Sequence, residues 1–370
     1  MLQLPRNLAA VVEPEANSEL GAPSSVPTDL AAVAFRNSTV RDVLLRPTVA
    51  VLAVGLVVTA TGYAPGPALA ALWRGSFGSP YVIVSTTLVR ATPLILTGLA
   101  VAIAFRASVW NIGAEGQLLA GATATAALGV ATGSALGPAA LPLALILGAL
   151  AGAGWAGIAA WLRRQFGVLE VISTIMLNFL ALETVGWLVR GPLQEPSRIY
   201  PQTSMLAKAF DMPQLAHSRL HAGFLLALLA AILAGWMLRH TAPGFRLRAT
   251  GANPFAAASA GQIDVDRAAT RAFLVSGALA GLAGAIEVTG VTHALYEDIS
   301  PGYGYTAIAV ALLAGLEPYA VIASGILFGA LEAGAAAMQR DAGVPSVVVS
   351  VVEATLILVF LIPKARERTA

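Results

Sequence analysis

Long stretches of apolar residues recur along this chain from about residue 47 to residue 362, and they constrain its fold more than any other feature. Hydrophobic residues make up 57% of the 370 residues and charged residues only 11%, whereas soluble domains carry roughly 25% charged residues. Each crossing of a bilayer needs about 20 apolar residues. The sequence therefore predicts an integral membrane protein, and soluble enzymes are excluded.

Ten apolar segments are separated by short polar stretches. They lie at about 47–62, 81–105, 117–133, 139–162, 171–189, 222–238, 271–291, 305–316, 319–338 and 347–362. Because helices satisfy their own backbone hydrogen bonds inside a bilayer, we expect an all-α fold, a polytopic transmembrane helical bundle. The first, third and eighth segments are short for a full span, so the predicted number of spans is eight to ten.

Composition divides the chain into three parts. Residues 1–39 are rich in proline and glutamate without sustained apolar periodicity, which predicts a mobile cytoplasmic N-terminal tail. Residues 40–363 form the predicted transmembrane domain, and residues 364–370 a cytoplasmic C-terminal tail. Basic residues are enriched in short loops on the cytoplasmic side of a membrane. If both termini are cytoplasmic, only roughly a quarter of the basic residues of this chain lie in external loops. We therefore expect the long loop at 190–221 to be external and the loop at 240–267 to be internal.

Glycines spaced four apart occur in three of the segments. The pairs are Gly148 and Gly152, Gly277 and Gly281, and Gly325 and Gly329. Each pair falls on one helix face and lets a neighbouring backbone approach closely. Packing within the bundle and a seam between two subunits are both compatible with this pattern.

Several kinds of chemistry are missing from the sequence. It holds no cysteine and none of the motifs GxxxxGK[ST], HExxH or GxSxG, so we expect no nucleotide hydrolysis and no hydrolase activity in this chain. His217 and His221 are four residues apart, but two imidazoles without a nearby third ligand make a poor zinc site. We expect neither a metal nor a cofactor.

Few ionisable residues interrupt the apolar segments. They are Arg90, Glu115, Glu170, Glu183, Glu287, Glu332 and Glu353. A charge inside a bilayer costs about 2.5 to 3.5 kcal/mol on insertion scales. Each of these side chains should therefore face the bundle interior, a partner or water.

Two polar breaks contain glycine and join apolar segments. The first spans 110–117 and the second 298–305, about 190 residues later. Glycine-interrupted segments in the two halves of a transporter indicate a cavity or gate at a repeat interface, so an internal repeat is plausible. The first break is equally compatible with an ordinary cytoplasmic turn.

The internal loop contains a third feature. The turn signal Asn253-Pro254 precedes an alanine-rich stretch flanked by arginines. A short helix outside the membrane would suit docking onto a cytosolic partner. A surface linker kept inside by its arginines is the other interpretation.

Four motifs at these places resemble a known family. They are NIGAEGQ at 111–117, VISTIMLNF at 171–179, GFRLRATGANPFAA at 244–257 and SPGYGYTAIAVALL at 300–313. Together they are similar to the permease subunit of bacterial ABC importers of the branched-chain amino acid and simple-sugar class. Within that class they look most like the nucleoside (basic membrane protein type) branch, and the resemblance covers nearly all of 47–362.

The resemblance implies a permease in the bacterial cytoplasmic membrane that is not itself an enzyme. Its implied partners are a second permease subunit, a cytosolic ATPase and an extracytoplasmic solute-binding lipoprotein. The predicted translocation pathway comprises Trp110, Asn111, Gly113, Glu115, Gly116, Gln117, Asn178, Tyr303 and Tyr305. The predicted ATPase-coupling loop comprises Gly244, Arg246, Arg248, Gly251, Asn253, Pro254, Ala256, Ala257 and Gly261.

Substrate and driving force are less constrained. Trp110 and the two tyrosines are suited to stacking on a flat heterocycle and the amides to binding hydroxyls, which fits a neutral nucleoside, although a sugar fits nearly as well. A secondary transporter driven by protons or sodium is the alternative, with Glu115, Glu183, Glu287 and Glu332 as relay candidates. The chain departs from the family pattern in Trp110, where phenylalanine is usual, in an extra residue at Gln262, and in the long tail before the first span.

Overall fold

The computed structural model describes residues 40–215, 218–259 and 261–367. Within them the regular structure is helical apart from two isolated β-bridges, Gln202 with Tyr296 and Gln214 with His221. The predicted tail at 1–39 and His217 lie outside the described residues. The predicted domain boundaries therefore stay predictions.

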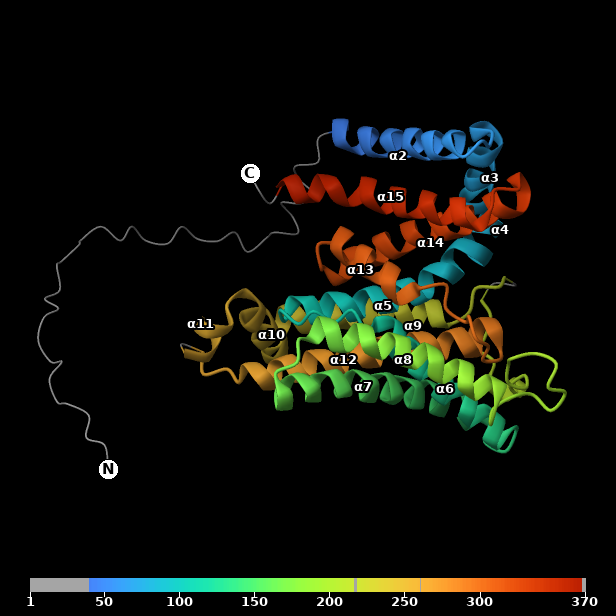
Figure 1. Cartoon of the computed structure of the whole chain (residues 1–370). Helices are drawn as coiled ribbons and strands as arrows, with labels where there is room; N and C mark the ends of the chain where they lie inside the picture. The colour runs from blue at the N-terminus through green and yellow to red at the C-terminus, as the bar shows by residue number, and fades with distance from the viewer. Residues whose placement is uncertain (1–39, 216–217, 260, 368–370) are drawn as a thin grey trace, which may run out of the picture.

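The helices follow one another with short connections (Figure 1). In chain order they are α2 (Val40–Ala60), α3 (Pro65–Phe77), α4 (Pro80–Val82), η1 (Ile83–Thr87), α5 (Leu88–Arg106), α6 (Ala114–Thr132), η2 (Gly137–Ala139), α7 (Ala140–Phe166), α8 (Glu170–Arg190), η3 (Lys208–Phe210), α9 (Gly223–His240), α10 (Ala242–Ala252), α11 (Pro254–Ser259), α12 (Val265–Glu287), η4 (Val288–Thr292), α13 (Tyr303–Leu313), α14 (Pro318–Ala342) and α15 (Ser346–Glu367). Here η1 and η4 are π-helical, and η2 and η3 are 3-10 turns.

The polytopic helical fold is confirmed. Six helical stretches are long and apolar enough to cross a membrane: Pro80–Arg106, Gly137–Phe166, Glu170–Arg190, Gly223–His240, Val265–Thr292 and Pro318–Ala342. Three shorter apolar helices lie at Val51–Ala60, Tyr303–Leu313 and Ser346–Leu356. Each of the ten predicted segments falls on a helix, whereas α3 was not predicted. Three segments were expected to be short. One of them, α13, has 11 residues, about half the length needed to cross a bilayer.

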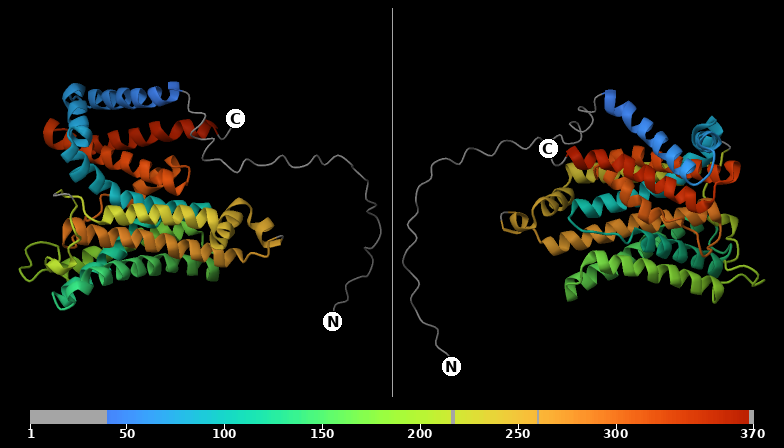
Figure 2. Two further views of the ribbon diagram at one scale, coloured as in Figure 1. Left: turned by 180° about the vertical axis from the view of Figure 1, so that it is seen from behind. Right: turned by 45° about the horizontal axis from the view of Figure 1, so that its top comes forward.

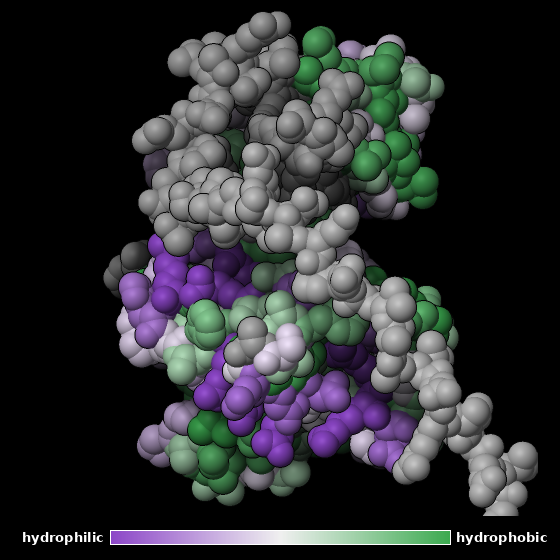
Figure 3. All heavy atoms as spheres, turned by 90° about the vertical axis from the view of Figure 1, so that its left-hand side faces the viewer, coloured by the Kyte–Doolittle hydropathy of each residue, from purple (hydrophilic) through white to green (hydrophobic). Residues whose placement is uncertain are grey.

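The spanning helices run roughly side by side between two ends of the molecule (Figures 1 and 2). The arginine-rich end carries α10, α11 and the C-terminal ends of α5, α7 and α9, with Arg106, Arg163, Arg164 and Arg239 in their last turns. Seen from this end, hydrophilic residues gather on the surface (Figure 3). The loop end carries residues 191–222. Helices α2, α3 and α15 share a smaller core with the C-terminal part of α14, beside the main core.

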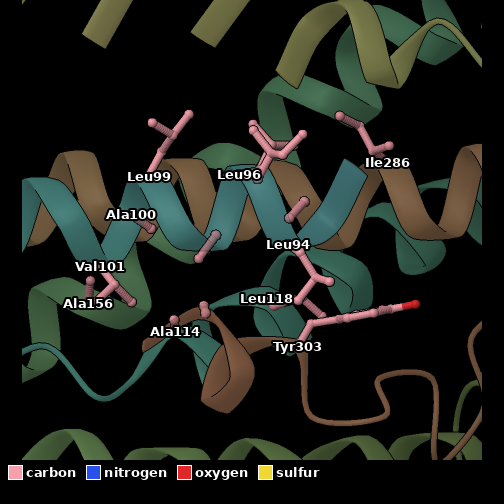
Figure 4. Close-up of a cluster of buried hydrophobic side chains, with 14 of the residues drawn as sticks. Leu94, Leu96, Leu99, Ala100, Val101, Ala114, Leu118, Ala156, Ile286 and Tyr303 are labelled. Atoms are coloured by element: carbon pink, nitrogen blue, oxygen red, sulfur yellow. The ribbon is translucent and has the colours of Figure 1, made fainter. Parts of the chain in front are cut away.

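The main core is built around α12, which packs on α5, α6 and α7. Figure 4 shows part of it, with Leu96 and Leu99 along α5 and Leu94 close to Leu118 of α6. Gly152 of α7 lies against the backbone of Gly277 and Gly281 of α12, leaving no room for a Cβ. Gly325 and Gly329 lie against α5 in the same way. All three glycine pairs thus pack against helices of their own chain.

Candidate functional site

The first break, between α5 and α6, is buried rather than exposed. Val109, Asn111 and Gly113 are buried in the seven-residue connection at 107–113, and α6 then begins with the buried residues Ala114 and Glu115. A non-helical segment buried in a membrane protein is tolerated only where other groups make hydrogen bonds with its backbone N–H and C=O groups. The side chains around it do so.

Asn111 is the centre of a network of amide side chains. Its Nδ2 donates to Ser276 Oγ on α12 at 2.8 Å and to Gln117 Oε1 at 3.1 Å. Its Oδ1 accepts from Gly113 N and from Gln117 Nε2, both at 2.9 Å. Asn111 is fully buried. If its side chain were replaced by an apolar one, each of these groups would lose a hydrogen-bond partner that water could not replace.

Asn178 ties α8 to the same break. Its Nδ2 donates to Ile112 O at 2.9 Å, and its Oδ1 accepts from Gly116 N at 2.8 Å. Thr174, one turn earlier on α8, accepts from Ile112 N at 3.3 Å. The first break is therefore fixed to α8 and α12 by the predicted residues Asn111 and Asn178. Thr174 and Ser276, which the sequence did not single out, supply the partners on these helices.

The second break meets the first at Glu115. Glu115 Oε2 accepts a 2.6 Å hydrogen bond from Gly304 N, and the carboxylate also bonds to Ser300. Gly304 lies so close to the backbone of Glu115 that a Cβ would overlap it. Both residues belong to the first turn of a helix, α6 and α13 respectively. The carboxylate on α6 thus satisfies one of the free backbone N–H groups in the first turn of α13.

The three aromatic residues of the predicted pathway do not form one site. Trp110 is 56% exposed, and its ring lies 5.0 Å from that of Phe105. Tyr303 is buried and lies beside Leu118 in the core (Figure 4). Tyr305 is exposed. No ring contact joins Trp110 to either tyrosine within the described part of the chain. Their part in a pathway stays a prediction.

Most of the intramembrane charges have partners. Arg90 Nη1 lies 3.9 Å from Glu332 Oε2 on α14, and Arg163 Nε lies 3.7 Å from Glu170 Oε1. Tyr303 interacts electrostatically with Arg90, Glu332 and the buried Glu287. Glu353 lies where side chains are not described. Glu183 is an exposed exception.

An ionic clamp at the arginine-rich end was not predicted. Glu317, in the turn between α13 and α14, accepts from Arg106 Nη2 at 2.8 Å and from Arg239 Nη2 at 2.7 Å. Arg106 Nε also donates to Leu316 O at 2.8 Å, and Arg239 lies over the ring of Tyr319 at 4.9 Å. The sequence feature that could have predicted this clamp was Glu317, a lone glutamate in a turn at the arginine-rich end.

The predicted coupling loop forms two helices. In α10, Gly244 packs on the Met237 backbone and Gly251 on the Arg106 backbone, while Arg246 and Arg248 are exposed. Gly251 O also accepts from Ser108 Oγ at 2.9 Å. The loop is therefore attached to the end of α5, next to the clamp.

Helix α11 projects from the rest of the molecule. Asn253 Oδ1 accepts from Ala256 N at 3.0 Å, and Pro254 occupies the first helical position, as a helix start requires. Ala256 is exposed, Ala257 is buried and Gly261 is exposed beyond the helix. Sequence reasoning did not single out Phe255, which is 85% exposed.

Comparison with known proteins gives one consistent family. Residues 83–361 match the pattern described as branched-chain amino acid transport system / permease component. Over 323 residues the chain is 41% identical to the guanosine ABC transporter permease protein NupP of Bacillus subtilis, covering 85% of this chain and 92% of that protein. It is 36% identical over 286 residues to the glucose ABC transporter permease protein TsgB13 of Haloferax volcanii, covering 74% of each. It is 31% identical over 312 residues to the nucleoside ABC transporter permease protein NupB of Lactococcus lactis, covering 82% and 85%. No solved structure matches the chain.

Proposed function

The chain belongs to the family of permease components of branched-chain amino acid transport systems, and from this membership we propose that it carries nucleosides inward as a subunit of an ABC importer. The single observation that carries the choice of substrate is the 41% identity with a guanosine permease over most of both chains. The nucleoside permease NupB supports the same choice, and the glucose permease TsgB13 makes sugars the substrates to test against it.

Uptake by intact cells tests this function. Cells with and without the gene are given labelled guanosine, glucose and leucine at the same concentration. We expect deletion to abolish saturable guanosine uptake and to leave leucine uptake unchanged. Loss of glucose uptake with intact guanosine uptake would contradict the proposed substrate.

We propose that α10 and α11 form the docking surface for a separate ATPase subunit. Support comes from the exposed Phe255 on a capped, projecting helix and from the exposed Arg246 and Arg248 beside it. An exposed aromatic side chain on a surface that also exposes arginines is typical of an interface core and its rim. The attachment of α10 to Arg106 gives that surface a direct connection to α5.

Charge reversal tests the docking surface. Arg248→Glu should leave the protein inserted and in normal amount but reduce ATP-dependent uptake by roughly tenfold or more, because a rim charge now repels its partner. Arg267→Glu is a matched control, since Arg267 is exposed on α12 outside α10 and α11 and pairs with Asp264. Normal uptake with Arg248→Glu would contradict the docking surface.

We further propose that the arginine-rich end is cytoplasmic, that the membrane is the bacterial cytoplasmic membrane, and that the other partners are a second permease and a solute-binding lipoprotein. Arginine bias supports the orientation. The chain has no cysteine, so single cysteines report it directly. Ser204→Cys should react with a membrane-impermeant thiol reagent added outside, whereas Ser259→Cys should not. The reverse labelling would invert the topology.

A further inference from the structure

A polar hollow lies at the outer half of α8, away from both breaks. It has a volume of about 390 Å3 and is lined by Glu183, Gly186, Trp187, Arg190, Gly191 and Glu297. This volume is within the range of small-molecule sites. Five of these residues belong to α8 or its end, and Glu297 comes from the segment between η4 and α13.

The exposed face of α8 is apolar toward the arginine-rich end and carries a carboxylate farther along. Helix α8 packs on α6 and α7, and no other helix lies in front of it in Figure 1. Its open face carries Ile172, Met176 and Phe179 toward the arginine-rich end, followed by Glu183 and Trp187. Glu183 lies seven residues, about 10 Å, from the end of the helix at Arg190. A carboxylate at that depth must face water or a polar ligand.

Glu183 has free hydrogen-bond acceptors. It makes no hydrogen bond or ion pair with any residue that the structure describes. Trp187, one turn later, is 67% exposed, so its ring and the carboxylate border the same space.

Glu297 closes the hollow from the other side. Its Oε2 accepts from Arg190 Nη2 at 2.7 Å, and its Oε1 lies 3.0 Å from where a Cβ on Gly186 would be. The absence of a side chain at Gly186 therefore lets this carboxylate lie against α8. Glu297 also precedes Ser300 by three residues, which places the hollow next to the second break.

We propose that this hollow receives the transported solute at the outer side of the permease, and that the solute it fits is an uncharged nucleoside. An exposed tryptophan stacks on a flat heterocycle, as aromatic side chains do in base recognition. The carboxylates of Glu183 and Glu297 accept hydrogen bonds from ribose hydroxyls and base N–H groups. With two carboxylates and one guanidinium the lining carries a net charge of −1, which disfavours nucleotides. This inference rests on the proposed import of nucleosides.

Photolabelling tests the site directly. The purified full-length chain in lipid nanodiscs is labelled with tritiated 8-azidoguanosine, and the labelled peptides are mapped. We expect label within 183–191 or at 293–302, with guanosine competing at least tenfold more strongly than guanosine monophosphate. Label confined to other peptides, or equal competition by the nucleotide, would overturn the proposal.

Variants separate recognition from folding. Trp187→Ala should reduce labelling about tenfold and Trp187→Phe less than threefold, because the phenyl ring keeps the stacking surface. Glu183→Gln should reduce it about fivefold. Trp236→Ala, at another exposed tryptophan on α9, is the matched control and should label as the wild type does. Equal losses of photolabelling for Trp187→Ala and Trp236→Ala would overturn the proposed site.

Uptake distinguishes a wrong function from a wrong binding site. If cells import no nucleoside, the proposed function fails. If they import guanosine normally with Trp187→Ala and Glu183→Gln, the function stands and the site is wrong.

Discussion

The two polar breaks look alike in the sequence but are stabilised very differently. The first is held by two asparagines and a glutamine that together bond to α8, α12 and its own backbone. The second has Ser300 capping its first backbone N–H groups, and Glu115 bonds to it through Gly304 N and Ser300. In these two breaks glycine marks where the helix is interrupted, whereas the number of amide side chains around the break determines how firmly it is held. We infer that the first break is the fixed point and that α13 is the more easily displaced element.

Replacing the central amide tests this difference with the largest expected effect. Asn111→Leu leaves several buried groups without partners, at about 1 to 3 kcal/mol each, so we expect the free energy of unfolding to fall by about 4 kcal/mol. The matched change at the second break, Ser300→Ala, should lower it by about 1 kcal/mol. Unfolding by detergent titration measures both. Similar losses would show that the two breaks are equally rigid.

A methyl group at the contact between the breaks should act next most strongly. Gly304→Ala places a Cβ against the backbone of Glu115, which costs about 2 to 3 kcal/mol because neither backbone can yield easily. Gly154→Ala on α7 is the control, since nothing lies within 4 Å of its Cβ position and alanine favours a helix. Thermal melting in detergent compares them. An unchanged melting temperature for Gly304→Ala would mean that α13 shifts without cost.

Substitutions of Glu115 test whether its carboxylate holds the two breaks together or relays protons. Glu115→Gln keeps an acceptor for Gly304 N and should retain partial uptake. Glu115→Leu leaves that N–H unpaired, at about 1 to 3 kcal/mol, and should abolish uptake. If Glu115→Gln alone abolished uphill uptake while ATP depletion did not, an ion-driven mechanism would be favoured. Normal uptake with both variants would remove Glu115 from the site.

The smallest expected effect concerns His221, which packs against η4, the π-helical turn before the second break. His221 is fully buried against Gly290 of η4, and this burial lowers the pKa of its imidazole to about 4. The folded chain therefore binds fewer protons here than the unfolded chain, whose histidine titrates near 6.5. The resulting stability is present above pH 6.5 and is lost as pH falls toward 4, by about 1 kcal/mol between pH 7.5 and pH 5.5.

Replacing the histidine checks the cause. Melting temperatures at the two pH values are compared for the wild type and for His221→Gln, which does not titrate. The pH-dependent difference should shrink in the variant. An equal difference in both proteins would assign the pH effect to other groups.

Much of the bundle could be predicted from the sequence because each apolar segment carries its own signal. The two breaks and the helix start at Asn253 were predictable from glycine, asparagine and proline. Helix α3 was missed because its 13 residues are too short to indicate a span. The clamp around Glu317 was missed because its three charged residues are far apart in the chain and meet only after folding.

The candidate site was less predictable than the fold. Asn111, Gln117 and Asn178 were expected to line a pathway; the structure shows them in a buried network, and their part in a pathway stays a prediction. Composition identifies a polar side chain inside an apolar region but does not show which neighbour it faces. Glu183 and Trp187 are one helical turn apart and were detectable as a pair, but Glu297 comes from more than 100 residues away.

The glycine contact between α7 and α12 has a consequence for temperature. Helices already inside a bilayer gain little from the hydrophobic effect when they associate, so this contact depends on dispersion and on weak Cα–H···O bonds between backbones. Little water is released when such a contact forms, and the heat capacity of a protein changes mainly with the hydration of its surface. The α7–α12 contact should therefore keep nearly the same strength in cold and warm membranes, while apolar contacts formed in water at the two ends weaken on cooling.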